Sequence, residues 1–294
     1  MNCEFPARAL FSIPLPTGAL SLGERPLVMG IVNVTPDSFA ERSPRLDAAA
    51  AVDLALQMAA EGADLIDIGG ESTRPGATPL PAEDEIARVM PVIRAVAGRL
   101  RLPLSIDTYK GEVARAALDA GASMVNDVSG LRREPALARI VAESGAALVL
   151  MHSRGTPQTM AQEARYGDVV AEVATELRTS LGVAAAAGVA PNRIIVDPGI
   201  GFAKGAADSY GVLARLPEIA GALGRPVLIG VSRKSFMREA LHDRPAAERD
   251  WGTAAAVTAA VLAGAHIVRV HAVAEMVQVV RVAEEIRKRG IAGS

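Results

Sequence analysis

Short apolar runs rich in branched residues recur along the chain, and each is followed by a longer segment with helical periodicity. The runs are apolar throughout rather than alternating with polar residues, which predicts strands buried on both faces, as in a parallel sheet. The eight runs cover residues 27–32, 64–69, 104–108, 124–128, 147–152, 193–197, 226–230 and 266–271.

Helices are expected in most segments between these runs and after the last of them. The predicted helices cover residues 47–61, 82–100, 110–120, 168–187, 251–263 and 274–288. Glycines recur just after helical segments, where a left-handed cap is favoured. They are Gly62, Gly121, Gly145, Gly188 and Gly264.

Eight strand–helix units in regular order are the number that closes a (β/α)8 TIM barrel, so we predict an α/β protein with a single barrel domain. An open, doubly wound sheet is the alternative, although such sheets usually have fewer strands and a reversal in the chain order. We expect the barrel to span residues 27–294. Residues 1–26 are interpreted as an N-terminal extension, with a short strand pair that covers the bottom of the barrel.

Composition narrows the class of protein further. Half of the 294 residues are hydrophobic and 22% are charged, which predicts a packed core rather than disorder. The formal charge is −2 and no basic stripe with interleaved aromatics occurs, so nucleic acid is not an expected partner. A single cysteine, Cys3, the absence of a signal-peptide pattern in the first 26 residues and the shortness of the apolar runs favour a cytoplasmic protein without a membrane partner.

Nearly every predicted strand ends in a polar residue or a polar turn. Because the carboxyl ends of barrel strands surround one cleft, these side chains are expected to converge there. A polar side chain in an apolar strand costs free energy unless it is satisfied, so the repetition at one end predicts a site. The residues are Asn33, Thr35–Asp37, Glu71–Arg74, Asp107, Asn126, Asp127, His152, Asp197, Ser232–Lys234, Arg269 and His271.

Some of these residues also have a purely structural interpretation. Asp67 and Asp127 could pair with the backbone or with a cation inside the barrel. His152 is expected to be a structural, hydrogen-bonding histidine rather than a catalyst. Asp107 could cap the helix that follows it.

Other residues indicate an anion. Arg233 and Lys234 are adjacent cations at a predicted helix start, which repels positive charge, so their presence favours a bound anion. Arg269 and His271, at the end of the last strand, lie where barrels commonly hold phosphate. The two long polar loops at 33–44 and 69–81 are expected to act as lids or substrate clamps.

The chemistry of the set suggests a ligand with two parts. Asp107, Asn126 and Asp197 beside Lys234 suit a flat heterocycle with donors on one edge and acceptors on another. A second group, Asn33, Arg269 and His271, suits phosphate and a metal ion. No nucleophile or all-protein metal cage is evident, which favours magnesium held by substrate phosphates and one protein ligand.

Eight motifs in order resemble the dihydropteroate synthase family, from about Pro26 to the end of the chain. They are MGIVNVTPDSF (29–39), DIGGESTRPGA (67–77), SIDT (105–108), VNDVSG (125–130), MHSRGTPQTM (151–160), DPGIGF (197–202), GVSRKSF (230–236) and RVH (269–271). The resemblance implies a transferase of folate biosynthesis. It joins 6-hydroxymethyl-7,8-dihydropterin diphosphate to 4-aminobenzoate and gives 7,8-dihydropteroate and diphosphate.

The resemblance also implies roles for individual residues. The pterin would lie deep in the barrel, and magnesium would be bound by Asn33 beside the diphosphate. The residues implied for the pterin are Asp107, Asn126, Asp197, Lys234 and Gly230; those for diphosphate are Arg269 and His271; those for aminobenzoate are Thr73, Arg74, Pro75, Phe202 and Ser232. Our hypothesis is a dissociative substitution that depends on Asp107, Asp197 and Lys234, with closure of the loop that carries Asp37 and Phe39. A homodimer through the last helices is implied as well.

The chain departs from the usual family pattern at four places. Residues 40–44 replace the usual Asp and paired Gly, and Ala203, Ser153 and Ala272 replace the commoner Gly, a bulkier residue and Asp. Two alternatives stay open. A methyltransferase acting on methyltetrahydrofolate would not need the STRPG loop or the RVH motif, and a non-catalytic paralogue would be expected to lose site residues, none of which is lost.

Overall fold

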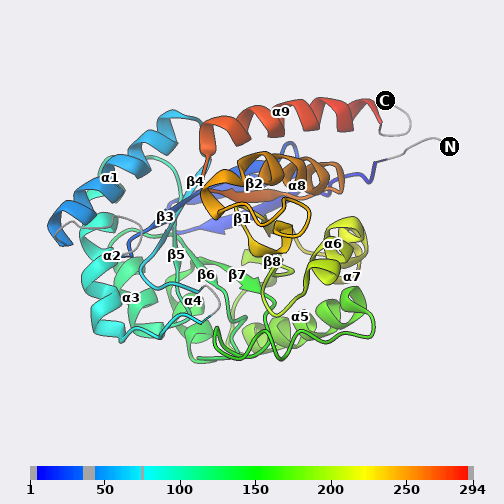
Figure 1. Cartoon of the computed structure of the whole chain (residues 1–294). Coiled ribbons are helices and arrows are strands. Elements are labelled where there is room, and N and C mark those ends of the chain that lie inside the picture. Colours follow the sequence, from blue (N-terminus) through cyan, green and yellow to red (C-terminus); the bar gives the residue numbers. More distant parts are fainter. Residues whose placement is uncertain (1–4, 36–43, 74–75, 291–294) are drawn as a thin grey trace.

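Eight parallel strands form the centre of the molecule in a computed structural model, which describes residues 5–35, 44–73 and 76–290, the side chains of 44–47 excepted (Figure 1). The strands are β3 (Leu27–Asn33), β4 (Leu65–Gly69), β5 (Leu104–Asp107), β6 (Met124–Asp127), β7 (Ala147–Met151), β8 (Ile194–Asp197), β9 (Leu228–Gly230) and β10 (Ile267–Val270). The first and last residues of every strand lie within three residues of the predicted ones, because a continuous apolar run between two turn signals can be recognised from the local sequence.

The sheet closes into a barrel. The strand order is β8-β7-β6-β5-β4-β3-β10-β9, and all neighbouring pairs are parallel. A single parallel bridge, Val196 to Val227, joins the two outer strands, and the Val196 amide donates to the Pro226 carbonyl at 3.0 Å. The predicted (β/α)8 barrel is therefore confirmed, and the open sheet is excluded.

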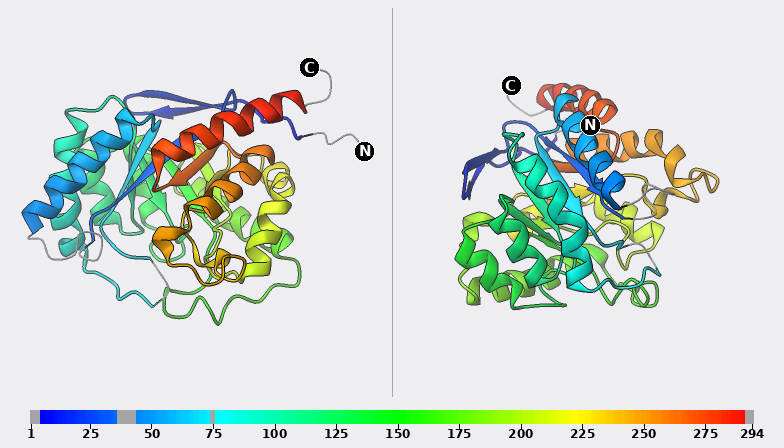
Figure 2. Two further views of the ribbon diagram at one scale, coloured as in Figure 1. Left: turned by 45° about the horizontal axis from the view of Figure 1, so that its top comes forward. Right: turned by 90° about the vertical axis from the view of Figure 1, so that its left-hand side faces the viewer.

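Helices surround this barrel (Figures 1 and 2). They are α1 (Pro44–Ala60), α2 (Ala82–Ala97), α3 (Gly111–Asp119), α4 (Leu137–Ser144), α5 (Val169–Ala186), α6 (Ala206–Ala214), α7 (Leu216–Leu223), α8 (Asp250–Leu262) and α9 (Val273–Arg289). The six predicted helices are confirmed, while α4, α6 and α7 had no predicted bounds; of these only α4 was indicated, by Gly145 just after it. All five predicted cap glycines have φ between 68° and 112°.

The valines on the last two helices face the barrel. Val257, Val261, Val277 and Val280 are all buried in the main apolar cluster. The sequence left open whether they face a partner, and in the structure they pack inward. None of the helices described is long and apolar enough to cross a membrane.

The N-terminal extension forms an antiparallel hairpin, β1 (Phe11–Leu15) with β2 (Gly18–Leu22). Its inward side chains form a second apolar cluster with the first residues of the barrel strands. That cluster includes Ile13, Leu15, Leu20, Leu22, Leu27, Leu65, Met124, Leu228 and Ile267. The hairpin therefore seals the amino-terminal end of the barrel, so substrates can reach the interior only from the opposite end, the mouth.

Candidate active site at the mouth of the barrel

Arg269 of β10 lies between two carboxylates in the barrel interior. Its Nε donates to Asp67 Oδ2 and its Nη2 donates to Asp107 Oδ2, both at 2.6 Å. Asn126 of β6 donates from Nδ2 to the same Asp67 oxygen at 3.0 Å. Four strands thus each contribute one side chain to a connected polar cluster.

Asp67 is a site residue that the sequence did not assign. It is fully buried in the middle of β4, and its Oδ1 has no hydrogen-bond partner among the described residues. A carboxylate within an apolar strand signals that a partner must exist, but it does not say which one. The partner, Arg269, is more than 200 positions away in the sequence.

Asp107 pairs with Arg269 rather than capping the next helix, so the capping alternative is wrong. Helix α3 begins at Gly111 without a side-chain cap from its N-cap residue, Lys110. Burial raises the pKa of Asp107 to about 7; the guanidinium of Arg269 opposes this shift and the neighbouring charge of Asp67 adds to it.

Asp197 and Lys234 bring a second set of opposite charges into the same region, with Asp197 buried and Lys234 half-buried. The Gly199 amide donates to Asp197 Oδ1 at 2.7 Å, and Lys234 Nζ donates to the Ile200 carbonyl at 2.7 Å. Burial raises the pKa of Asp197 and lowers the pKa of Lys234 to about 8. A Cβ on Gly230 would lie 3.5 Å from Lys234 Nζ and 3.9 Å from Asp197 Oδ2, so this glycine leaves space beside both groups.

A pocket at the rim brings Thr73 and Phe202 together, as the sequence predicted. The loops after β6 and β7 complete its lining, with Val128, Ser129, Arg133, Ser153, Gly155, Thr156, Pro157 and Met160. Lys234 Nζ lies 4.6 Å from the centroid of the Phe202 ring, which connects this pocket to the buried charges. Ser232 does not line it.

Ser232 instead contacts the last strand. His271 Nδ1 lies 2.9 Å from Ser232 Oγ, and the His271 amide donates to that oxygen at 3.2 Å. Arg233 binds Asp250 of α8 through two hydrogen bonds of 2.7 and 2.8 Å. The expectation that Arg233 faces a bound anion is therefore corrected, and a 3-10 turn at Ser235–Met237 follows instead of a helix.

The remaining predicted residues lie at the edge of the cluster or outside the described part. Asn33 ends β3 opposite Gly69 and is half-buried. Its amide oxygen is the kind of hard donor that magnesium accepts, and no group of three or more His, Cys, Asp or Glu side chains suited to a metal occurs among the described residues. The residues that fall outside them are Asp37, Phe39, Arg74 and Pro75.

Two polar residues identified in the sequence make internal contacts, in line with their structural interpretation. Asp127 accepts from the amide and the hydroxyl of Ser129, both at 2.7 Å. His152 is buried and contacts Lys204 and Glu176 through its two ring nitrogens. Lys204 was not among the predicted site residues, because nothing in the sequence around a lysine in a glycine-rich loop indicates that its side chain is buried.

Known proteins resemble this chain over nearly its whole length. The pterin binding enzyme family model matches residues 29–271. A dihydropteroate synthase of Synechocystis sp. is 45% identical over 278 residues, which are 94% of this chain and 96% of the relative. The solved structure of Xanthomonas albilineans dihydropteroate synthase with 4-aminobenzoic acid has a TM-score of 0.85 and 45% identity, covering 92% of this chain and 95% of that one. A Burkholderia cenocepacia dihydropteroate synthase complexed with 7,8-dihydropteroate has a TM-score of 0.85 and 45% identity, covering 96% and 98%.

Proposed function

Since the chain belongs to the pterin-binding enzyme family, we propose how its barrel mouth performs the dihydropteroate synthase reaction. The substrates are 6-hydroxymethyl-7,8-dihydropterin diphosphate and 4-aminobenzoate, and the products are 7,8-dihydropteroate and diphosphate. The observation that carries the proposal is the meeting of two carboxylates, an amide and an arginine at the end of the barrel opposite the hairpin.

The pterin ring is proposed to bind deep in the barrel, against Asp107, Asn126, Asp197 and Lys234. A pterin has ring and exocyclic N–H donors as well as acceptor atoms, and this set offers carboxylates for the former and a lysine for the latter. The unpartnered Oδ1 of Asp67 is a further acceptor for a pterin N–H. The space beside Gly230 would accommodate the edge of the ring.

The diphosphate is proposed to compete with Asp107 for Arg269. In the structure this guanidinium is shared between Asp67 and Asp107. A diphosphate carries more charge than one carboxylate and would take over the Nη2 hydrogen bond. Asp107 would then be released toward the pterin, so that leaving-group recognition and pterin recognition are coupled. His271 would bind the diphosphate from the other side.

The bond changes follow from these contacts. The bond between the pterin methylene carbon and the diphosphate oxygen breaks, and its electron pair leaves on the diphosphate. The resulting cation is conjugated with the pterin ring, and the ionised forms of Asp67, Asp107 and Asp197 outnumber Arg269 and Lys234, so the site favours that positive charge. The amine lone pair of aminobenzoate then forms the new C–N bond, and the amine proton passes to solvent.

Magnesium is proposed as the metal, with Asn33 as its protein ligand. When bound, it would neutralise part of the charge of the leaving diphosphate. Aminobenzoate is proposed to occupy the rim pocket between Thr73 and Phe202, with Arg74 and Pro75 as the further contacts that the resemblance implies. Ser232 would reach it from the side of His271, and the contact of Lys234 with the Phe202 ring would place the amine next to the pterin.

Release of diphosphate from the synthetic pterin diphosphate, measured with magnesium and with or without 4-aminobenzoate, tests the function. Release that depends on aminobenzoate and yields dihydropteroate is the expected result. Pterin binding without release in either case would favour a non-catalytic paralogue. Transfer of a methyl group from methyltetrahydrofolate to a corrinoid would favour the methyltransferase alternative.

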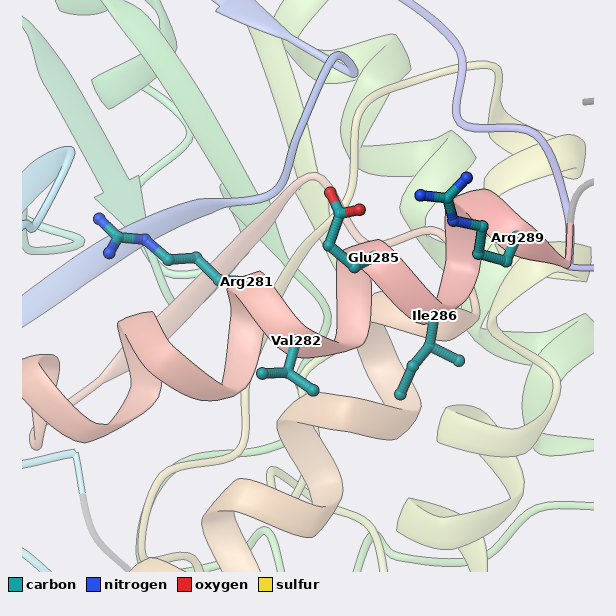
Figure 3. Close-up of a pocket in the computed structure, with 5 residues that line it drawn as sticks. All are labelled: Arg281, Val282, Glu285, Ile286 and Arg289. Atoms are coloured by element: carbon teal, nitrogen blue, oxygen red, sulfur yellow. The ribbon is translucent and has the colours of Figure 1, made fainter.

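A homodimer remains a proposal, and its support is the outer face of α9 (Figure 3). Val282 and Ile286 are 63% and 50% exposed there, beside a row of charged side chains formed by Arg281, Glu285 and Arg289. Such a stripe could pair with its own copy around a twofold axis, Glu285 facing an arginine of the other subunit. Val282→Glu should then yield monomers in analytical ultracentrifugation, and an unchanged sedimentation coefficient would refute this interface. The cytoplasm as compartment likewise stays a prediction.

A further inference from the structure

Lys204, in the loop between β8 and α6, is buried although no carboxylate of the described residues forms an ion pair with its amine. Its Nζ contacts three acceptors: His152 Nδ1 at 2.8 Å, the Gly199 carbonyl at 3.1 Å and the Phe202 carbonyl at 3.1 Å. Burial lowers the pKa of Lys204 to about 7. In its protonated form the amine has three N–H donors, and these three contacts use all of them. The side chain therefore ties both ends of a tight turn to a neighbouring strand.

This turn, the residue 199–204 loop, is held close to the end of β7. A Cβ on Gly199 would lie 1.9 Å from the His152 carbonyl oxygen, and the φ of Gly199 is +70°, so only glycine is compatible with this approach. The loop carries Phe202, which lines the rim pocket, and its Ile200 carbonyl accepts from Lys234. Two lysines thus hold one loop, the half-buried Lys234 from the side of β9 and the buried Lys204 from the side of β7.

His152 connects this anchor to an ion-pair network. Its Nε2 lies 3.1 Å from Glu176 Oε2, and Glu176 also accepts from Arg132 and Arg154. A carboxylate facing Nε2 favours the tautomer with the proton on that nitrogen, which leaves Nδ1 to accept from Lys204. Burial and the charge of Lys204 lower the pKa of His152 to about 4, so the ring stays neutral and able to accept near pH 7.

We propose that Lys204 is a positioning residue for the aminobenzoate half of the site, acting through the residue 199–204 loop with His152 as its fixed partner. The inference rests on the proposed function, since Phe202 is taken to contact aminobenzoate. Neither Lys204 nor His152 lines the rim pocket. Substitution of Lys204 or His152 should therefore make the position of Phe202 less fixed. The side chains of β5 and β6 that are proposed to bind the pterin should keep their positions.

Lys204→Met, which keeps the length of the side chain, tests the anchor. We expect the KM for aminobenzoate to rise about tenfold while the KM for pterin diphosphate and kcat change less than about threefold. Hydrogen exchange of the amides in residues 199–205 should also become faster, with exchange in the barrel strands unchanged. The exchange measurement needs no turnover. If the wild type forms no dihydropteroate, the proposed function is refuted. The exchange data would still show whether Lys204 holds the residue 199–204 loop in place.

Two variants of His152 separate a specific contact from a general packing effect. His152→Asn keeps an acceptor near the position of Nδ1 and loses the contact to Glu176, whereas His152→Gln keeps a polar group near Nε2 and loses the acceptor for Lys204. We expect His152→Gln to resemble Lys204→Met and His152→Asn to resemble the wild type. A matched control is His266→Gln, because His266 is also buried and hydrogen-bonded through both nitrogens, to the Val227 amide and the Ala9 carbonyl, at the sealed end.

The control should lower stability without changing either KM. An aminobenzoate KM within twofold of wild type in folded Lys204→Met would overturn the inference. Equal rises in both KM values, or equal behaviour of the two His152 variants, would do the same. Unchanged exchange of residues 199–205 in Lys204→Met would refute the anchor itself.

Discussion

The two ends of the barrel each bury an arginine with carboxylates, but in different ways. At the sealed end, Arg8 binds both oxygens of Glu284, at 3.2 and 2.9 Å, and also reaches the Gly23 and Val261 carbonyls. At the mouth, Arg269 is divided between Asp67 and Asp107 with one hydrogen bond to each. At the sealed end Arg287 Nη1 also lies 3.7 Å from Glu284 Oε1, so two arginines share one carboxylate there, whereas at the mouth two carboxylates share one arginine.

The ion pair of the sealed end stabilises the fold, whereas the ion pairs of the mouth can rearrange to bind a substrate. Arg8 forms a bidentate pair with Glu284 and also donates to backbone carbonyls, so an incoming ligand would not readily displace either partner. A shared guanidinium can release one partner to an incoming anion, and buried groups around it have pKa values near neutrality, about 7 for Asp107 and about 8 for Lys234. Such shifted values are frequent where groups act on a substrate.

The largest expected effect concerns Asp107. Asp107→Asn should lower kcat by about two to four orders of magnitude, because it removes a charge that stabilises the cationic transition state. The measurement is product formation in a variant whose unfolding transition is unchanged. The matched control is Asp64→Asn, which alters a carboxylate paired with Arg25 near the sealed end of β4 and should keep normal turnover. Near-normal turnover of Asp107→Asn would refute its role.

Removing the arginine of the sealed end should affect folding and not catalysis. Arg8→Met leaves Glu284 buried without its main partner, which should lower the free energy of unfolding by about 3 kcal/mol. Urea denaturation measures this loss, and kcat should stay within about twofold of wild type. The double variant Arg8→Met/Glu284→Leu should recover only part of the stability, because the buried Arg287, whose Nη1 lies 3.7 Å from Glu284 Oε1, then loses its carboxylate. A loss of turnover without a loss of stability would contradict this division between the ends.

The pH dependence of kcat/KM for the pterin diphosphate should reflect the buried groups of the mouth. Because the pKa of Asp107 is raised to about 7, activity should fall as the pH drops below that value and the carboxylate takes up a proton. Because the pKa of Lys234 is lowered to about 8, activity should fall again as the pH rises above it and the ammonium loses its charge. Lys234→Arg should remove the alkaline decrease, since arginine stays charged. A profile that is flat from pH 6 to 9 would contradict both assignments.

The smallest expected effect is on α9, which connects the two ends. Its N-cap residue is Ala272, which has no side-chain cap, whereas Asp168 caps α5 by accepting from the Val170 and Ala171 amides. Ala272→Asp, the residue more usual in the family, should raise the free energy of unfolding by about 1 kcal/mol. Thermal denaturation measures the gain, and Ala272→Asn should give most of it if capping rather than charge is responsible. An unchanged midpoint in both variants would refute the capping explanation.

Most of the framework was predictable because its signals are local. Continuous apolar runs marked the eight strands, and glycines after helices marked the caps. Helix α4 was indicated only by Gly145 after it, and α6 and α7 were missed because Arg215 and a proline at the start of α7 divide this segment into two short helices. Polar residues at strand ends indicated where the site lies, since all eight strands of a parallel barrel point the same way.

What the sequence determined alone is therefore the barrel, the end that carries the site and the types of residue gathered there. Only the tertiary structure decided which charges meet. Arg233 and Lys234 are adjacent in the sequence, yet one binds Asp250 outside the barrel and the other lies beside Phe202. Arg269 meets Asp67 and Asp107 from positions 202 and 162 residues away. Such pairings depend on strand register and on the closure of the barrel, which no short stretch of sequence contains.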